Sequence, residues 1–82
     1  MLEKFKDHLL INGKSWNTTY NYLLRIEQVL AKVKEEDFNT ENITAYLREL
    51  QKENTASTVN GYLASIIAYS KFIKKDIELP KF

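Results

Sequence analysis

Apolar side chains recur at intervals of three and four residues in four separate segments of the chain, which is the spacing of one face of an α-helix. In the first segment, Leu2, Phe5 and Leu9 alternate with charged residues, and Gly13 follows them. Glycine readily adopts the left-handed conformation that ends many helices. The pattern therefore predicts a short amphipathic helix that ends near Asn12.

The second segment predicts a longer helix, from about Trp16 to Lys34, with Ser15 as its N-cap. Trp16 and Tyr20 lie to one side of its apolar face, near the N-terminal end, and we expect both to be half-buried packing residues. The face itself, which we expect to belong to the core, consists of Tyr22, Leu23, Ile26, Val29, Leu30 and Val33.

The third segment predicts a helix that begins with Thr40 as its cap and carries an acidic outer face. Because phosphates repel carboxylates, we expect this face to point away from any nucleic acid. The side chains expected to be buried are Ile43, Tyr46, Leu47 and Leu50.

The fourth segment predicts a helix from its cap, Thr55, to about Lys74, with an inward face of Val59, Leu63, Ile66, Ser70 and Ile73. Gly61 lies inside this helix, where glycine is about 1 kcal/mol less favourable than alanine. We therefore expect some group to approach the backbone closely at Gly61.

Four helices in 82 residues predict a single all-α domain, a compact four-helix bundle over residues 1–75. Residues 76–82 have no helical period and contain the only proline, so we interpret them as the start of a linker to a further domain. The chain has no cysteine, no apolar run of about 18 residues and no signal-peptide layout. These features favour a cytoplasmic, monomeric domain.

The net charge is only +1, but its distribution along the chain is uneven. Residues 14–34 carry a balance of +3, residues 35–54 a balance of −4, and residues 55–75 again +3. If the two basic segments share a face of the folded molecule, that face would attract a polyanion.

The starts of the second and fourth predicted helices are both rich in short polar side chains. Asn17, Thr18 and Asn21 follow the first cap, and the run of residues 55–60 contains threonine, serine and asparagine. Free backbone N–H groups and hydroxyls at a helix start favour anions such as phosphate. We expect the two helix starts to lie side by side on a common basic surface.

With these elements in order, the sequence resembles the core-binding domain of tyrosine recombinases, the phage-type integrases. The resemblance spans essentially the whole chain. It rests on Phe5-Lys6-Asp7-His8-Leu9-Leu10 before Gly13 and Ser15; on Thr18, Tyr22 and Ile26 in a T-x-x-x-Y-x-x-x-L pattern; on Thr40-Glu41-Asn42-Ile43 with Tyr46-Leu47; and on Thr55-Ala56-Ser57-Thr58-Val59-Asn60 leading to Leu63 and Ile66 before the proline.

The resemblance implies a SAM-like orthogonal bundle that clamps one side of a recombination site, with helices two and four toward double-stranded DNA. Other recombinase protomers would be partners in the synaptic complex. Lys14, Thr18, Thr55 and Ser57 are expected to contact phosphates, and Asn17, Asn21 or Arg25 to reach base edges. The residues expected to bind DNA are Lys14, Asn17, Thr18, Asn21, Arg25, Thr55, Ser57, Asn60 and Lys71.

The sequence departs from the family pattern at two positions, because relatives often carry arginine or lysine near Asn60 and Gly61. The catalytic residues of the family belong to the domain after the linker, and this chain has no H-x-x-R motif. Its single histidine, His8, is expected to be plain surface. We therefore expect no catalytic residue, no metal and no cofactor in this fragment.

The main alternative is a small protein–protein interaction module. Trp16, Tyr20, Leu24 and Ile67 could form an apolar patch on the surface of such a module. The polar residues also have simpler interpretations. Ser15 and Thr55 would serve as caps in any case, and Thr18 and Thr58 could satisfy nearby backbone groups.

Overall fold

The computed structural model describes residues 2–75 and 77–79 of the chain, and these residues form helices but no strand. The elements are α1 (Glu3–Ile11), α2 (Trp16–Lys32), the short 3-10 helix η1 (Glu35–Asp37), α3 (Thr40–Glu53) and α4 (Ala56–Phe72). The prediction of an all-α, four-helix bundle is therefore confirmed. No described helix combines the length and the apolar character needed to cross a membrane.

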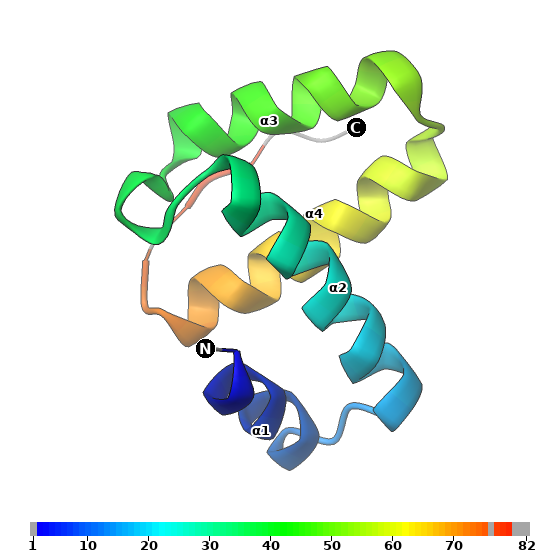
Figure 1. Ribbon diagram of the computed structural model, residues 1–82, viewed down its shortest axis with the longest axis vertical. Coiled ribbons are helices and arrows are strands. Elements are labelled where there is room, and N and C mark those ends of the chain that lie inside the picture. The colour runs from blue at the N-terminus through cyan, green and yellow to red at the C-terminus, as the bar shows by residue number, and fades with distance from the viewer. Residues whose placement is uncertain (1, 76, 80–82) are drawn as a thin grey trace.

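Helices α2 and α4 form the centre of the bundle and cross each other (Figure 1). Helix α1 packs against both of them at one end of the molecule, and α3 packs along α4 at the other. The N-terminal halves of α2 and α4 nevertheless carry exposed residues, among them Asn17 and Asn21 of α2 and Ser57 and Asn60 of α4.

The core is built from the apolar faces that the helical periodicity predicts. Phe5 is fully buried, and its ring centroid lies 5.1 Å from that of Tyr69 and 5.3 Å from that of Phe72. Phe38, the apolar residue of the connection after η1, also packs edge-on against Tyr69. The buried apolar side chains are Phe5, Leu9, Ile26, Val29, Phe38, Ile43, Leu47, Val59, Ile66 and Tyr69.

The predicted caps of α2 and α4 are confirmed, whereas the predicted cap of α3 is wrong. Asn39, not Thr40, caps α3: its backbone is extended and its Oδ1 accepts a hydrogen bond of 2.9 Å from the backbone N–H of Asn42. Thr40 is already the first helical residue. Its hydroxyl oxygen instead accepts a hydrogen bond of 3.1 Å from the backbone N–H of Glu78.

Helices α2 and α4 each end two residues earlier than the sequence predicts. Val33 has extended backbone angles, which turns the chain into η1 after Lys32. At the end of α4, Lys74 adopts a positive φ of 59° and the chain leaves the helical path. Gly13 has a φ of 87°, so the predicted left-handed residue after α1 is confirmed.

The segment after α4 lies against the bundle where it is described. Ile77 and Leu79 are half-buried and pack against the core cluster. Residues 76 and 80–82, which belong to the predicted linker, lie outside the described residues.

The stability of the domain is expected to fall between pH 10 and about pH 12 because of Tyr69. Burial, together with a hydrogen bond of 3.1 Å to Glu35 Oε1 and the charge of that carboxylate, raises the pKa of Tyr69 to about 12. The folded state therefore favours the neutral phenol, and this contribution is complete below pH 10 and is lost as the pH rises toward 12. Urea unfolding at pH 9, 10, 11 and 12 measures this loss.

The matched control for this effect is Tyr20, whose side chain is exposed. Tyr69→Phe should flatten the alkaline dependence relative to the wild-type chain, whereas Tyr20→Phe should leave it unchanged. Equal slopes for the two variants would show that Tyr69 does not carry the effect.

Candidate nucleic-acid interface

The first turn of α2 presents polar side chains around a closed cap. The Ser15 hydroxyl donates to Thr18 Oγ1 at 2.9 Å, and the backbone N–H of Thr18 donates to Ser15 Oγ at 3.1 Å. Thr18 is therefore engaged locally. Asn17 and Asn21 are exposed and lie one turn apart on the same face of α2.

The first turn of α4 repeats this arrangement. The backbone N–H of Thr58 donates to Thr55 Oγ1 at 3.3 Å, and the Thr55 hydroxyl donates to Thr58 Oγ1 at 3.2 Å. Ser57 and Asn60 are exposed beside this cap. Thr55, which the sequence predicts to contact DNA, is thus the cap of α4, and the hydroxyl of Thr18 accepts a hydrogen bond from the cap of α2, so either hydroxyl can meet a phosphate only in addition to this bond.

Arg25 connects the two helices at their crossing. It continues the α2 face of Asn17 and Asn21 by one further turn, and its guanidinium lies against Gly61 of α4. A Cβ atom placed on Gly61 would be 2.9 Å from Arg25 Cζ. The close approach predicted at Gly61 is confirmed, and the group that approaches is Arg25.

A second pair of side chains holds the same crossing one turn further along α2. The hydroxyl of Tyr62, the residue after Gly61, donates a hydrogen bond to Gln28 Oε1. Sequence reasoning did not find this pair, because the two residues are 34 positions apart and only the fold brings them together.

The starts of α2 and α4 do not lie side by side, so that expectation is wrong. Both lie on the same side of the molecule in Figure 1, but toward opposite ends of its long axis, because the two helices cross instead of running alongside each other. Arg25 of α2 and Gly61 of α4 meet where the two helices pack together.

Lys14, which precedes the α2 cap, and Lys71, in the last turn of α4, come together away from the start of α4. They line a shallow groove of about 430 Å³ between α1, the start of α2 and the C-terminal half of α4. Lys14 Nζ lies 5.9 Å from the ring centroid of Tyr22, which also lines this groove. We call this feature the basic groove.

His8 also lines the basic groove, and its surroundings differ from those expected. Its ring packs against Phe72, with the centroids 5.1 Å apart, and it is half-buried. The prediction of plain surface is therefore wrong. The signal was the Phe5-to-His8 spacing of three residues, which places both rings on the side of α1 that meets α4.

The basic groove is lined by Lys14 and Lys71 and, among the described residues, by no carboxylate. Within residues 2–75 and 77–79 the structure contains one ion pair, Lys52 with Glu49 on α3, so Lys14, Arg25 and Lys71 have no acidic partner there. Such a pair of cations in one groove, Lys14 and Lys71, attracts a polyanion.

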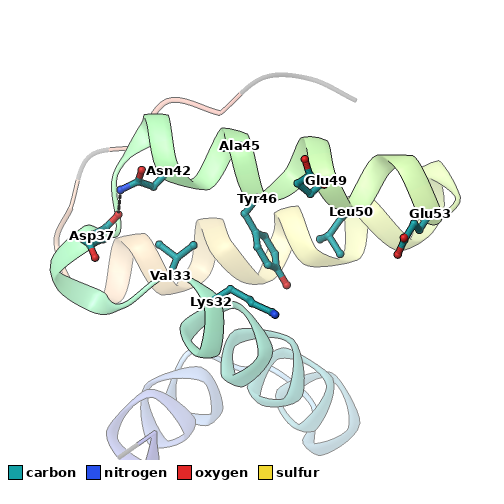
Figure 2. Close-up of a pocket in the computed structure, with 9 residues that line it drawn as sticks. All are labelled: Lys32, Val33, Asp37, Asn42, Ala45, Tyr46, Glu49, Leu50 and Glu53. Carbon is teal, nitrogen blue, oxygen red and sulfur yellow. Dashed lines mark hydrogen bonds between the residues drawn. The ribbon is translucent and has the colours of Figure 1, made fainter.

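Another groove lies between the C-terminal end of α2 and α3 and has an acidic rim (Figure 2). Its volume is about 670 Å³, and Asp37, Glu49 and Glu53 outnumber the single cation, Lys32. Burial, and to a smaller extent the neighbouring Tyr62, raise the pKa of Tyr46 in this groove. A phosphate backbone would be repelled here, as the sequence predicts for α3.

Trp16 and Tyr20 are more exposed than the sequence predicts. Their exposed fractions are 65% and 56%, so the prediction of half-buried packing residues is wrong for both. The Lys6 ammonium lies 5.6 Å from the Trp16 ring centroid. Together with the exposed Leu24, one turn beyond Tyr20, they form an apolar stripe on α2 next to the polar face of Asn17 and Asn21.

Comparison with known families gives one match. Residues 2–76 match the family described as the phage integrase N-terminal SAM-like domain. Comparisons with curated proteins and with solved structures return no match.

Proposed function

The chain belongs to the family of phage integrase N-terminal SAM-like domains, and from this premise we propose that it is the double-stranded DNA-binding module of a site-specific tyrosine recombinase. The observation that carries the proposal is the crossing of α2 and α4. There Arg25, which has no ion-pair partner among the described residues, lies against Gly61 of α4, and both helices carry exposed, short polar side chains, Asn17 and Asn21 on one and Ser57 and Asn60 on the other.

The proposed contacts divide into two kinds. Lys14 and Lys71 in the basic groove, with the capped first turns at Thr18 and Thr55, position the domain on phosphates, since ammonium groups and free backbone N–H groups suit anions. Asn17, Asn21 and Arg25 are the candidates for base edges; Ser57 and Asn60 extend the surface along α4. Asparagine pairs bidentately with adenine, and arginine with guanine.

The family is that of the N-terminal domain of integrases, not of their catalytic domain. We propose that the parent protein carries its catalytic residues in a separate domain, to which residues 76–82 begin the linker. In this arrangement the bundle holds one side of the recombination site and leaves strand cleavage, and contacts with further protomers, to the full-length protein.

Titration of the ¹⁵N-labelled domain with a duplex of about 20 base pairs is expected to shift the amide signals of Asn17, Asn21, Thr55 and Lys71. The signals of the acidic face of α3, such as that of Glu49, should move little, because phosphates avoid carboxylates. Asn21→Ala should weaken binding by about tenfold if its amide reads a base. The matched control is Gln51→Ala, which removes an exposed amide from α3 and should leave the affinity unchanged.

A protein–protein interaction module remains the second candidate, favoured by the exposed apolar stripe. Trp16, Tyr20, Leu24 and Ile67 are all exposed. If duplex DNA shifts no signal, and the mass of the domain in solution increases with concentration in a manner that Trp16→Ser abolishes, self-association replaces DNA binding as the function of this surface.

A further inference from the structure

Gly61 occupies a place where glycine has no conformational role. It lies inside the 17-residue helix α4, and the positive-φ glycine of the described residues is Gly13 alone. Gly61 therefore has ordinary helical backbone angles that alanine adopts more readily. The reason for a glycine at this position must be space outside the helix.

That space is filled by Arg25. A Cβ atom on Gly61 would lie 2.9 Å from Cζ, 3.1 Å from one terminal nitrogen and 3.3 Å from Nε of the Arg25 guanidinium. Three guanidinium atoms at such similar distances mean that the planar group presents its face to the α4 backbone. Any side chain at position 61 would push the guanidinium from this position.

The guanidinium held in this way serves no ion pair of the described fold. The structure pairs Glu49 with Lys52 and leaves Arg25, which is half-buried, without a carboxylate partner. A helix position that favours alanine therefore holds glycine, and the space that this leaves is occupied by the Arg25 guanidinium where α2 meets α4. This points to a ligand rather than to stability as the reason for the contact.

We propose that Gly61 is a positioning residue for Arg25, and that Arg25 in this seat recognises the major-groove edge of a guanine. This inference rests on the proposed DNA-binding function. The fork of an arginine matches guanine O6 and N7 bidentately, and a guanidinium held in place before binding loses less freedom on contact. Lys14 and Lys71, which are exposed and on flexible stems, supply phosphate contacts instead.

The test compares Gly61→Ala, Arg25→Ala and the double variant with the wild-type chain. Gly61→Ala should raise the melting temperature by about 4–8 °C and at the same time weaken binding to the preferred duplex about tenfold. A purely structural role of Gly61 cannot give these opposite signs. In the Arg25→Ala background, Gly61→Ala should have no further effect on affinity.

Binding of each variant to a library of randomised duplexes supplies the second readout. The wild-type chain should prefer G·C at one position, and this preference should disappear in both Gly61→Ala and Arg25→Ala. Arg25→Lys in the Gly61→Ala background should recover affinity but not the preference for G·C. The compact lysine ammonium fits beside a Cβ atom, but it cannot form the bidentate hydrogen bonds of a guanidinium.

The outcomes separate this inference from the function on which it rests. If the wild-type chain binds no duplex DNA, both fail. If it binds DNA with a marked salt dependence but Gly61→Ala binds as tightly as wild type, only the positioning role is wrong. If Arg25→Ala weakens all duplexes equally, Arg25 contacts phosphate and the guanine assignment is overturned.

Discussion

Replacement of Phe5 by alanine is expected to lower the free energy of unfolding by about 3–5 kcal/mol, which is a large part of the total for a small domain. Phe5 is fully buried and packs against Tyr69 and Phe72 of α4, with ring centroids 5.1 Å and 5.3 Å away. Its loss leaves a cavity between α1 and α4 that nearby rings cannot fill. The melting temperature followed by circular dichroism should fall by about 15–30 °C.

Ile11→Ala on the same helix is the matched control. Ile11 is 84% exposed, so its truncation should change the free energy of unfolding by no more than about 0.5 kcal/mol. If Phe5→Ala melted with the wild-type chain, α1 would not complete the core of the domain. Equal losses in the two variants would mean that helix propensity, not burial, determines the contribution of α1.

The interior of the fold was predictable because it depends on local periodicity. Ile26, Val29, Ile43 and Leu47 fall on the apolar faces that the spacing predicts, and each is fully buried. A side chain at the centre of such a face becomes buried in the core, however the other helices are arranged. The sequence alone therefore predicts that these helices form and which of their faces points into the core.

The N-cap of α3 was less predictable, because two neighbouring residues could serve as the cap. Asn39 and Thr40 are adjacent, and both residue types are good N-caps. The structure selects Asn39, whose side chain accepts from Asn42 N–H, and uses the Thr40 hydroxyl to hold the backbone of Glu78. The second contact joins residues 38 positions apart, and no local signal predicts it.

The candidate site shows the same division between local and distant information. The capped helix starts at Ser15 and Thr55 were predictable, because a cap and its partner are three residues apart. The sequence also indicated a close approach at Gly61, from the cost of glycine in a helix. It could not identify Arg25 as the approaching group, since that depends on the crossing of α2 and α4.

The crossing also changes how the domain would meet DNA. Two helix starts side by side would contact one short stretch of phosphates, whereas starts toward opposite ends of the long axis would contact separate stretches of the DNA backbone. Arg25 would then lie between these two contacts and face the major groove of the DNA. Under the proposed function, this geometry would give phosphate positioning and base recognition to different parts of one surface.

Binding of duplex DNA is expected to weaken steeply as salt increases, because each neutralised phosphate releases counterions. Two phosphate contacts, from Lys14 and Lys71, predict about a 12-fold loss of affinity between 50 and 200 mM salt, and six contacts predict about a thousandfold loss. Fluorescence anisotropy with a labelled duplex at four salt concentrations measures the slope of log affinity against log salt. An affinity that does not change with salt would contradict the electrostatic basis of the proposed function.

The variants Lys71→Gln and Lys52→Gln test which face of the bundle is responsible for the salt dependence of DNA affinity. Each removes one positive charge from the last turn of a helix, Lys71 from α4 and Lys52 from α3, so the two changes have the same effect on net charge and on the helix dipole. Lys71 lines the basic groove, whereas Lys52 is paired with Glu49 at 3.1 Å. Lys71→Gln should therefore reduce the slope by about 0.9, and Lys52→Gln should leave it unchanged. If both variants reduced the slope equally, DNA would be attracted by net charge alone, and the basic groove would have no special part in binding.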